Sequence, residues 1–298
     1  MQKFILSTDS TCDLYAGFIK ENDIKFVSLT YTVEDKAGNI TDGLDAFTDY
    51  SQYVDFYNML RDGSLSRTSM LNYESHMAHF TALAKEGAED VVHFTISSGL
   101  SPTVTVAEKA AAEVKKSYPE FNVYAIDSLS ATIGQGALVR AALRMRNEGK
   151  TAAETAEYVK ALRFKIQYMI AANDLNYLRR GGRVSSVAAV AGTMLGIKPI
   201  LTFSREGKLV IADKVRGMKR AFALALEKME KYPPSDEHGF FWIVHTDAEE
   251  DAHKLADMVE EKYGVRPDIS IMGPVIGSHV GPGAVAIIWK SDIERNDG

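Results

Sequence analysis

The sequence predicts an α/β protein of two domains: an N-terminal Rossmann-like domain with a parallel sheet, followed by a second α/β domain with a mixed or antiparallel sheet. Three observations lead to this prediction. Short apolar runs with strand character alternate with segments in which apolar residues recur every three to four positions. Polar turns follow three strands of the first half, as in open parallel sheets. In the second half, the residues around Gly207 are typical of an antiparallel hairpin.

The expected strands are apolar runs bounded by turn residues. The first run leads into Ser7-Thr8-Asp9-Ser10-Thr11, a turn rich in helix-capping side chains. In chain order the strands are expected at 4–6, 26–33, 91–96, 123–126, 168–172, 209–212, 240–244, 269–272 and 285–289. Between most of them, helical periodicity predicts helices at 13–20, 47–60, 74–85, 104–116, 131–147, 152–164, 218–231 and 252–262. We place the domain boundary between residues 164 and 165, which gives domains 1–164 and 165–298.

The composition excludes several classes of protein. The 298 residues carry 34 Lys and Arg against 40 Asp and Glu, a net charge of −6, so the chain lacks the positive field that nucleic-acid binding usually needs. Cys12 is the single cysteine, which rules out an internal disulfide and a metal site of several thiolates. No stretch approaches the roughly 18 apolar residues of a membrane span. We therefore expect a cytoplasmic protein with no nucleic-acid partner and at most transient membrane contact.

Two polar turns of the first domain are candidate anion sites. Ser97-Ser98-Gly99-Leu100-Ser101 follows a buried strand and opens a helix, where free backbone N–H groups, the helix dipole and hydroxyls converge on a carboxylate or phosphate. The alternative is a serine-rich cap that serves only its own helix. Thr68 and Ser69 precede Asn72, the expected cap of the next helix, so their hydroxyls are free to face the same crevice.

Residues 178–220 are strongly basic. They hold ten Lys or Arg against two acidic residues, a local excess of eight positive charges that includes Arg180, Arg183 and Arg216. This excess favours a docking surface for an acidic or phosphorylated partner, and the alternative is a set of solvated surface charges. Residues 187–196 within the segment are small or apolar, which suits either the wall of a narrow apolar channel or ordinary close packing.

His279 lies in Gly277-Ser278-His279-Val280-Gly281-Pro282-Gly283, which we interpret as a polar loop before a buried strand. A histidine held there can bind an anion, although a lone histidine is more often a structural hydrogen-bonding residue. Several catalytic templates are absent: the sequence has no nucleophile elbow and no phosphate-binding loop with its upstream glycine. We therefore predict no catalytic residues, no metal site and no cofactor, and a function in binding.

In order and spacing, these motifs resemble the DegV family of bacterial fatty-acid-binding proteins along nearly the whole chain. The resemblance rests on seven segments, namely 7–14, 68–70, 96–101, 126–128, 177–185, 197–200 and 279–283. One departure is Pro102, since the family usually continues Leu-Ser-Gly-Thr-Tyr at this turn. Proline at the first position of a helix is compatible with a helix start.

The resemblance implies that one long-chain fatty acid is bound between the two domains, with its tail in an apolar tunnel. It implies that the carboxylate is held at the domain junction by Thr68, Ser69, Ser97, Ser98 and His279. Ala188, Ala191 and Leu195 are candidates for the tunnel wall. Well-studied members of the family are similar to carrier subunits of a fatty acid kinase, so we expect an ATP-binding kinase subunit as partner, docked at Arg180, Arg183 and Arg216.

Two other functions are consistent with the residues. In a serine- or histidine-dependent hydrolase or acyltransferase, Ser97 or Ser98 would attack and His279 would act as the base. In an interaction protein, the basic face alone would carry the function.

Overall fold

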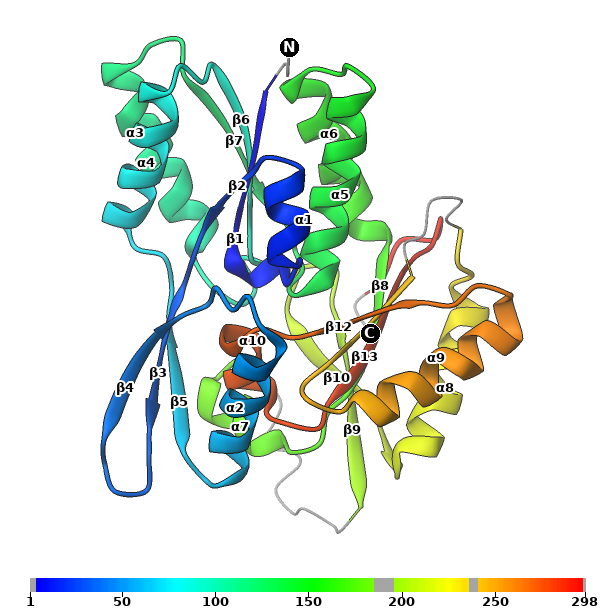
Figure 1. The fold of residues 1–298 in the computed structure, drawn as a ribbon. Helices are drawn as coiled ribbons and strands as arrows, with labels where there is room; N and C mark the ends of the chain where they lie inside the picture. The colour runs from blue at the N-terminus through cyan, green and yellow to red at the C-terminus, as the bar shows by residue number, and fades with distance from the viewer. Residues whose placement is uncertain (1–3, 185–195, 236–240, 297–298) are drawn as a thin grey trace.

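The computed structural model describes residues 4–184, 196–235 and 241–296. Its upper half in Figure 1 is built on a four-stranded parallel sheet in the order β2-β1-β6-β7. The strands are β1 (Ile5–Asp9), β2 (Ile24–Val27), β6 (Asp90–Thr95) and β7 (Asn122–Asp127). Helices cover both faces: α3 (Tyr73–Lys85) and α4 (Thr103–Ser117) pack on one, and α1 (Ala16–Glu21), α5 (Ile133–Asn147) and α6 (Ala152–Leu162) lie on the other. This is the Rossmann-like arrangement that the strand and helix alternation predicts.

The second domain is built on a six-stranded mixed sheet in the order β10-β9-β8-β13-β11-β12. The strands are β8 (Ile166–Ala171), β9 (Ile197–Phe203), β10 (Leu209–Arg216), β11 (Phe241–His245), β12 (Asp268–Ile271) and β13 (Val285–Lys290). Only the β11–β12 pair is parallel. The outer face is covered by α8 (Met218–Lys231) and α9 (Glu249–Tyr263), while side chains of the inner face join α5 and the first sheet in one core. The α/β fold class with two different sheets is confirmed.

A third sheet was not predicted. It is a small antiparallel sheet of β4 (Ile40–Leu44), β3 (Thr30–Glu34) and β5 (Leu65–Ser69). Together with α2 (Tyr50–Arg61) it lies beside the short helices α7 (Leu175–Gly181) and α10 (Pro274–Val280) in the lower part of the molecule (Figure 1). Short 3-10 turns at Ser10–Cys12 and Arg163–Lys165 complete the described elements. The small sheet brings residues 30–69 of the first half of the chain onto the second domain.

Two expectations about local structure are wrong. Residues 26–33 do not form one strand, because β2 ends before Leu29, whose backbone N–H donates to Ser10 Oγ. The strands β2 and β3 on either side of Leu29 belong to different sheets. Residues 277–280 are not a loop: they end α10, whose first residue Pro274 has its backbone angle fixed for a helix. Of the glycines that suggested a loop, Gly277 lies inside this helix against Tyr57, and Gly281 ends it.

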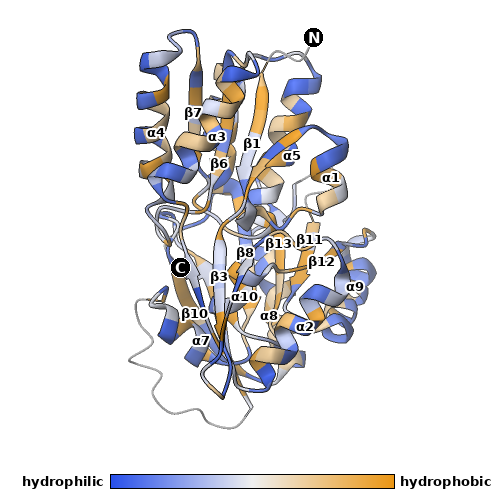
Figure 2. Ribbon diagram, turned by 60° about the vertical axis from the view of Figure 1, so that its left-hand side comes forward, coloured by the Kyte–Doolittle hydropathy of each residue, from blue (hydrophilic) through white to orange (hydrophobic). Residues whose placement is uncertain are grey.

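Hydrophobic residues concentrate in the strands and on the inward faces of the helices (Figure 2). Within the described ranges, no helix combines the length and the apolar character that crossing a bilayer requires. Ala188, Ala191 and Leu195 lie outside the described residues. The boundary between residues 164 and 165 stays a prediction.

Candidate functional site

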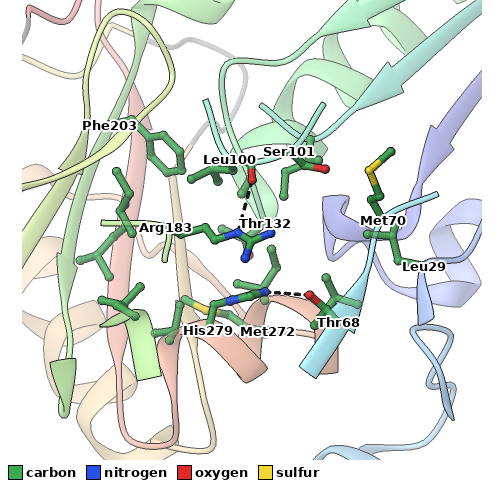
Figure 3. A pocket seen from close by; sticks show the side chains of 18 residues that line it. Leu29, Thr68, Met70, Leu100, Ser101, Thr132, Arg183, Phe203, Met272 and His279 are labelled. Carbon is green, nitrogen blue, oxygen red and sulfur yellow. Dashed lines mark hydrogen bonds between the residues drawn. The ribbon is translucent and has the colours of Figure 1, made fainter. Parts of the chain in front are cut away.

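A pocket lies where the carboxyl end of the parallel sheet meets the second domain. The empty space between its lining residues is about 760 Å³, which includes space open to solvent. Thirteen of its eighteen lining residues are apolar, namely Leu29, Met70, Ile96, Leu100, Ala131, Ile170, Leu178, Phe203, Leu209, Met272, Val275, Ile276 and Val280. The polar ones are Thr68, Ser101, Thr132, Arg183 and His279 (Figure 3). Such a wall suits a ligand that is mostly hydrocarbon with a small polar group.

Thr68 and His279 form the polar pair of the pocket. Thr68 Oγ1 is 2.8 Å from His279 Nε2 (Figure 3). Thr68 is placed by β5, in which it pairs with Tyr31 of β3, and His279 is placed by the last turn of α10. On the other side of the imidazole ring lies Gly181, where a Cβ atom would overlap His279 Nδ1. A glycine at the end of α7 therefore allows the ring to fit between α7 and β5.

The pair is electrically neutral, and one cation stands beside it. Burial, together with the charge of Arg183, lowers the pKa of His279 to about 4. At neutral pH His279 is therefore an uncharged hydrogen-bonding group. Among the lining residues that the structure describes, Arg183 is the one Lys or Arg. Its Nε donates to Leu100 O at 3.4 Å, and its guanidinium also donates to Gly181 O. Hydroxyl, imidazole and guanidinium groups together favour an anionic ligand atom at this end of the pocket.

The serine turn does not present its first two serines to the pocket. Ser97 is fully buried, and its hydroxyl donates to Gly207 O at 2.7 Å and accepts from Gly99 N. Gly207 has φ +74°, and a Cβ atom there would overlap the Ser97 hydroxyl, so this position requires glycine. The hydrogen bond of Ser97 connects the serine turn to the β9–β10 hairpin of the other domain. Ser98 is exposed, with its backbone N–H on Asp127. Leu100 and Ser101 are the residues of this turn that line the pocket.

The remaining predicted residues are scattered around the site. Ser69 is exposed and is not among the lining residues, since neighbouring residues of a strand point to opposite faces. Arg180 is exposed and stacks over the Tyr177 ring at 4.4 Å, and Arg216 ends β10 at the surface. Neither Ser97 nor Ser98 is hydrogen-bonded to His279 in the part of the chain that the structure describes. The nucleophile and base that a hydrolase needs are therefore not paired here.

Sequence reasoning missed three polar residues of the pocket. It assigned Arg183 to a docking surface because ten basic residues occur together, and nothing in their pattern distinguishes the one that turns inward. It named the serine turn but not Ser101, which the spacing of the turn alone does not separate from Ser98. Thr132 gave no signal. Among the described residues no three His, Cys, Asp or Glu side chains are arranged to hold a metal ion.

Comparisons with known proteins agree with this architecture. The family model described as "Uncharacterised protein, DegV family" matches residues 3–292. A DegV domain-containing protein of Clostridium perfringens is 33% identical over 297 residues, covering 99% of this chain and 100% of the relative. The crystal structure of a DegV lipid-binding protein from Thermotoga maritima has a TM-score of 0.82 and 28% identity, covering 99% of this chain and all of the other. A DegV protein from Thermus thermophilus, described for its fatty acid binding, has a TM-score of 0.80 and 27% identity, covering 97% and 99%.

Proposed function

The chain belongs to the DegV family, and from this premise we propose that it binds one long-chain fatty acid in the pocket between its domains, with the carboxylate at Thr68, His279 and Arg183. The observation that carries the proposal is the pairing of Thr68 with His279 at a pocket whose other walls are almost entirely apolar. Solved relatives described as lipid- or fatty-acid-binding share the fold over nearly the full chain, which supports the same ligand class.

The physical chemistry of the pocket fits this ligand. Each buried methylene contributes about 0.8 kcal/mol, so an acyl tail against thirteen apolar residues supplies most of the affinity. The head group needs hydrogen-bond donors more than a full ion pair, and Thr68, a neutral His279 and the Arg183 guanidinium supply them. Ser97 and Ser98 are not included among the head-group ligands, because their described hydrogen bonds lie elsewhere.

A comparison of head groups tests this proposal. Delipidated protein is titrated with stearic acid, stearyl alcohol and methyl stearate, which share one tail. We expect stearic acid to bind at least tenfold more tightly than the ester, because the ester cannot place an anion beside Arg183. Equal affinities for the three ligands would contradict head-group recognition, and failure of all three to bind would contradict the function itself.

We also propose that the protein is a carrier without catalysis of its own, which presents the carboxylate to a separate ATP-binding fatty acid kinase. The open position of Arg183 and Met70 beside the pocket supports this, since a second protein can reach the head group there. Arg180 and Arg216 are the proposed contacts for an acidic partner.

The carrier role is tested with His279→Ala. If His279 orients the carboxylate for transfer, the variant loses acyl phosphate formation by a partner kinase more strongly than it loses fatty-acid affinity. Arg180→Glu with Arg216→Glu serves as the docking variant and is expected to lower kinase-coupled turnover with unchanged fatty-acid affinity. Turnover equal to that of the native protein in both variants would reject the roles of His279, Arg180 and Arg216. Absence of kinase-coupled turnover in the native protein would reject the kinase partnership, and either result leaves the binding function standing.

A further inference from the structure

Thr132 is the most unusual residue of the pocket wall. It caps the start of α5 with φ +51° and ψ −147°, a backbone conformation that branched residues rarely adopt. A strained residue of this kind persists only where the surrounding structure holds it, and such residues concentrate at functional sites. The side chain of an ordinary cap residue accepts a hydrogen bond from the first turn of its own helix. The Thr132 side chain makes no such bond, and the residue lines the pocket instead.

The hydroxyl of Thr132 is buried without a partner. The residue is 4% exposed, and Oγ1 makes no hydrogen bond with any residue that the structure describes. The Thr132 hydroxyl lies near the buried Asp13 carboxyl. Burial raises the pKa of Asp13, and the nearby hydroxyl lowers that pKa by a smaller amount. No hydrogen bond of normal geometry joins the two groups. A buried hydroxyl in this state is costly, so the site gains when a ligand supplies the missing hydrogen bond.

Thr132 is a buried polar residue of a largely apolar pocket wall. Met70 is 37% exposed and Arg183 is also exposed, whereas Thr132, Ile96 and Met272 are buried. In Figure 3 Thr132 lies near the Arg183 guanidinium. No hydrogen bond joins Thr132 to Thr68 or His279 among the described residues, so the pocket has a second polar position besides that pair.

We propose that the pocket accepts a long-chain fatty acid that carries a hydroxyl group on its chain, and that Thr132 binds this hydroxyl. The inference rests on the proposed function and specifies its ligand. A ligand hydroxyl both donates and accepts, as the threonine hydroxyl does, so each satisfies the other in either direction. The buried Asp13 carboxyl close to Thr132 favours a ligand hydroxyl over a second carboxylate at this position, because two ionised carboxylates close together repel each other.

The test measures dissociation constants of the delipidated full-length protein for stearic acid and for a series of stearic acids with one hydroxyl moved along the chain. The variants are Thr132→Val, which keeps the branched shape and removes the hydroxyl, and Thr132→Ser, which keeps the hydroxyl. For each hydroxy acid we take the ratio of its dissociation constant to that of stearic acid. At one hydroxyl position, this ratio is expected to be at least tenfold higher in Thr132→Val than in the native protein. Thr132→Ser should keep the native ratio.

An unchanged ratio at every position would overturn the proposal and assign the hydroxyl to Asp13. If Thr132→Val does not fold, the affinities of the native protein for the same series of acids test the proposal. One hydroxylated position should then bind at least as tightly as stearic acid while the others bind weaker, and a uniform penalty along the chain would overturn the proposal. Failure of stearic acid and the whole series to bind would instead contradict the proposed function.

Discussion

At the scale of single residues, the alternation of β5 decides which hydroxyl serves the pocket. Thr68 and Ser69 are neighbours with similar chemistry, yet Thr68 lines the pocket and contacts His279, while Ser69 is exposed. The next inward residue, Ser66, has its Oγ 2.6 Å from Ser278 Oγ, so this face of the strand is joined to α10 at two points. The neighbouring pair therefore offers a matched test of head-group binding.

Thr68→Val is expected to weaken the binding of a long-chain fatty acid at least tenfold, because the loss of one hydrogen bond to a charged group costs roughly 1.5–3 kcal/mol. Ser69→Ala is the control and should bind with native affinity. Isothermal titration of both variants measures the difference, and circular dichroism checks that each is folded. A native affinity in Thr68→Val, or equal losses in the two variants, would contradict the placement of the carboxylate at Thr68.

Sequence reasoning found part of the site because some residue types reveal their chemistry locally. Thr68 and His279 were named from free hydroxyls near a cap and from a histidine between glycines. Arg183 and Thr132 were not assigned to the pocket, because their place there depends on segments far apart in the sequence: Arg183 reaches Leu100, 83 positions earlier, and Thr132 shares the pocket wall with Met272. Local sequence carries no information about such distant contacts.

At the scale of elements, α7 and α10 pack closely only because α7 ends in glycine. A Cβ at Gly181 would overlap His279, and one at Gly281, just after α10, would overlap the Tyr177 ring. Each helix thus places a glycine against a ring of the other. The loop predicted at 277–283 is wrong at its start, because Gly277 serves close packing against Tyr57 inside α10, whereas Gly281 and Gly283 have φ +76° and +83° and follow the helix.

Gly181→Ala is expected to weaken fatty-acid binding at least tenfold by displacing His279 from Thr68. Gly17→Ala in α1 is the matched control, because a side chain there meets nothing within 4 Å. In both positions alanine favours the helix by about 1 kcal/mol. Thermal unfolding together with titration separates the two effects: Gly17→Ala should raise stability and keep the native affinity. A native affinity in Gly181→Ala would show that the ring position is not needed.

A histidine cluster joins β1, β6 and α3. Ser7 Oγ is 2.7 Å from His79 Nε2 and 2.8 Å from His93 Nδ1, and both ring nitrogens of the buried His76 lack partners among the described residues. Burial lowers the pKa of His76 and of His79 to about 4, and that of His93 well below its ordinary value. All three imidazoles are therefore neutral in the folded protein at neutral pH.

This cluster predicts a loss of stability in acid. Unfolded histidines take up protons near pH 6.5, but folded His76 and His79 do so only near pH 4, so the free energy of unfolding falls as the pH falls between these values. Each histidine contributes up to about 1.4 kcal/mol per pH unit. Asp13 and Asp45, whose pKa values burial raises, act in the opposite direction. The histidine effect is therefore read from the difference between the native protein and His76→Leu.

Urea unfolding at pH 7.5 and pH 5.0 measures this difference. The stability of His76→Leu relative to the native protein should increase as the pH falls. A difference independent of pH would mean that His76 binds protons equally in the folded and unfolded states, and would contradict its lowered pKa.

At the scale of the whole molecule, the pocket exists because two different sheets share one core. Helix α5 packs on the parallel sheet and also contacts the inner face of the six-stranded sheet, and the pocket opens where this shared core ends. Periodicity predicted the two sheets, since each strand is a local apolar run. It did not predict the small sheet of β3, β4 and β5, because these strands are largely polar and little buried. They form a sheet because β3 pairs with both β4 and β5.

Fatty-acid binding is tested most directly by native mass spectrometry of the purified protein, followed by solvent extraction of any bound lipid. We expect one long-chain fatty acid per chain, released on collisional activation and identified after extraction. We also expect that Thr68→Val retains less of this ligand than Ser69→Ala under the same conditions. A native protein that carries no lipid and takes up none from an added series of fatty acids would contradict the account.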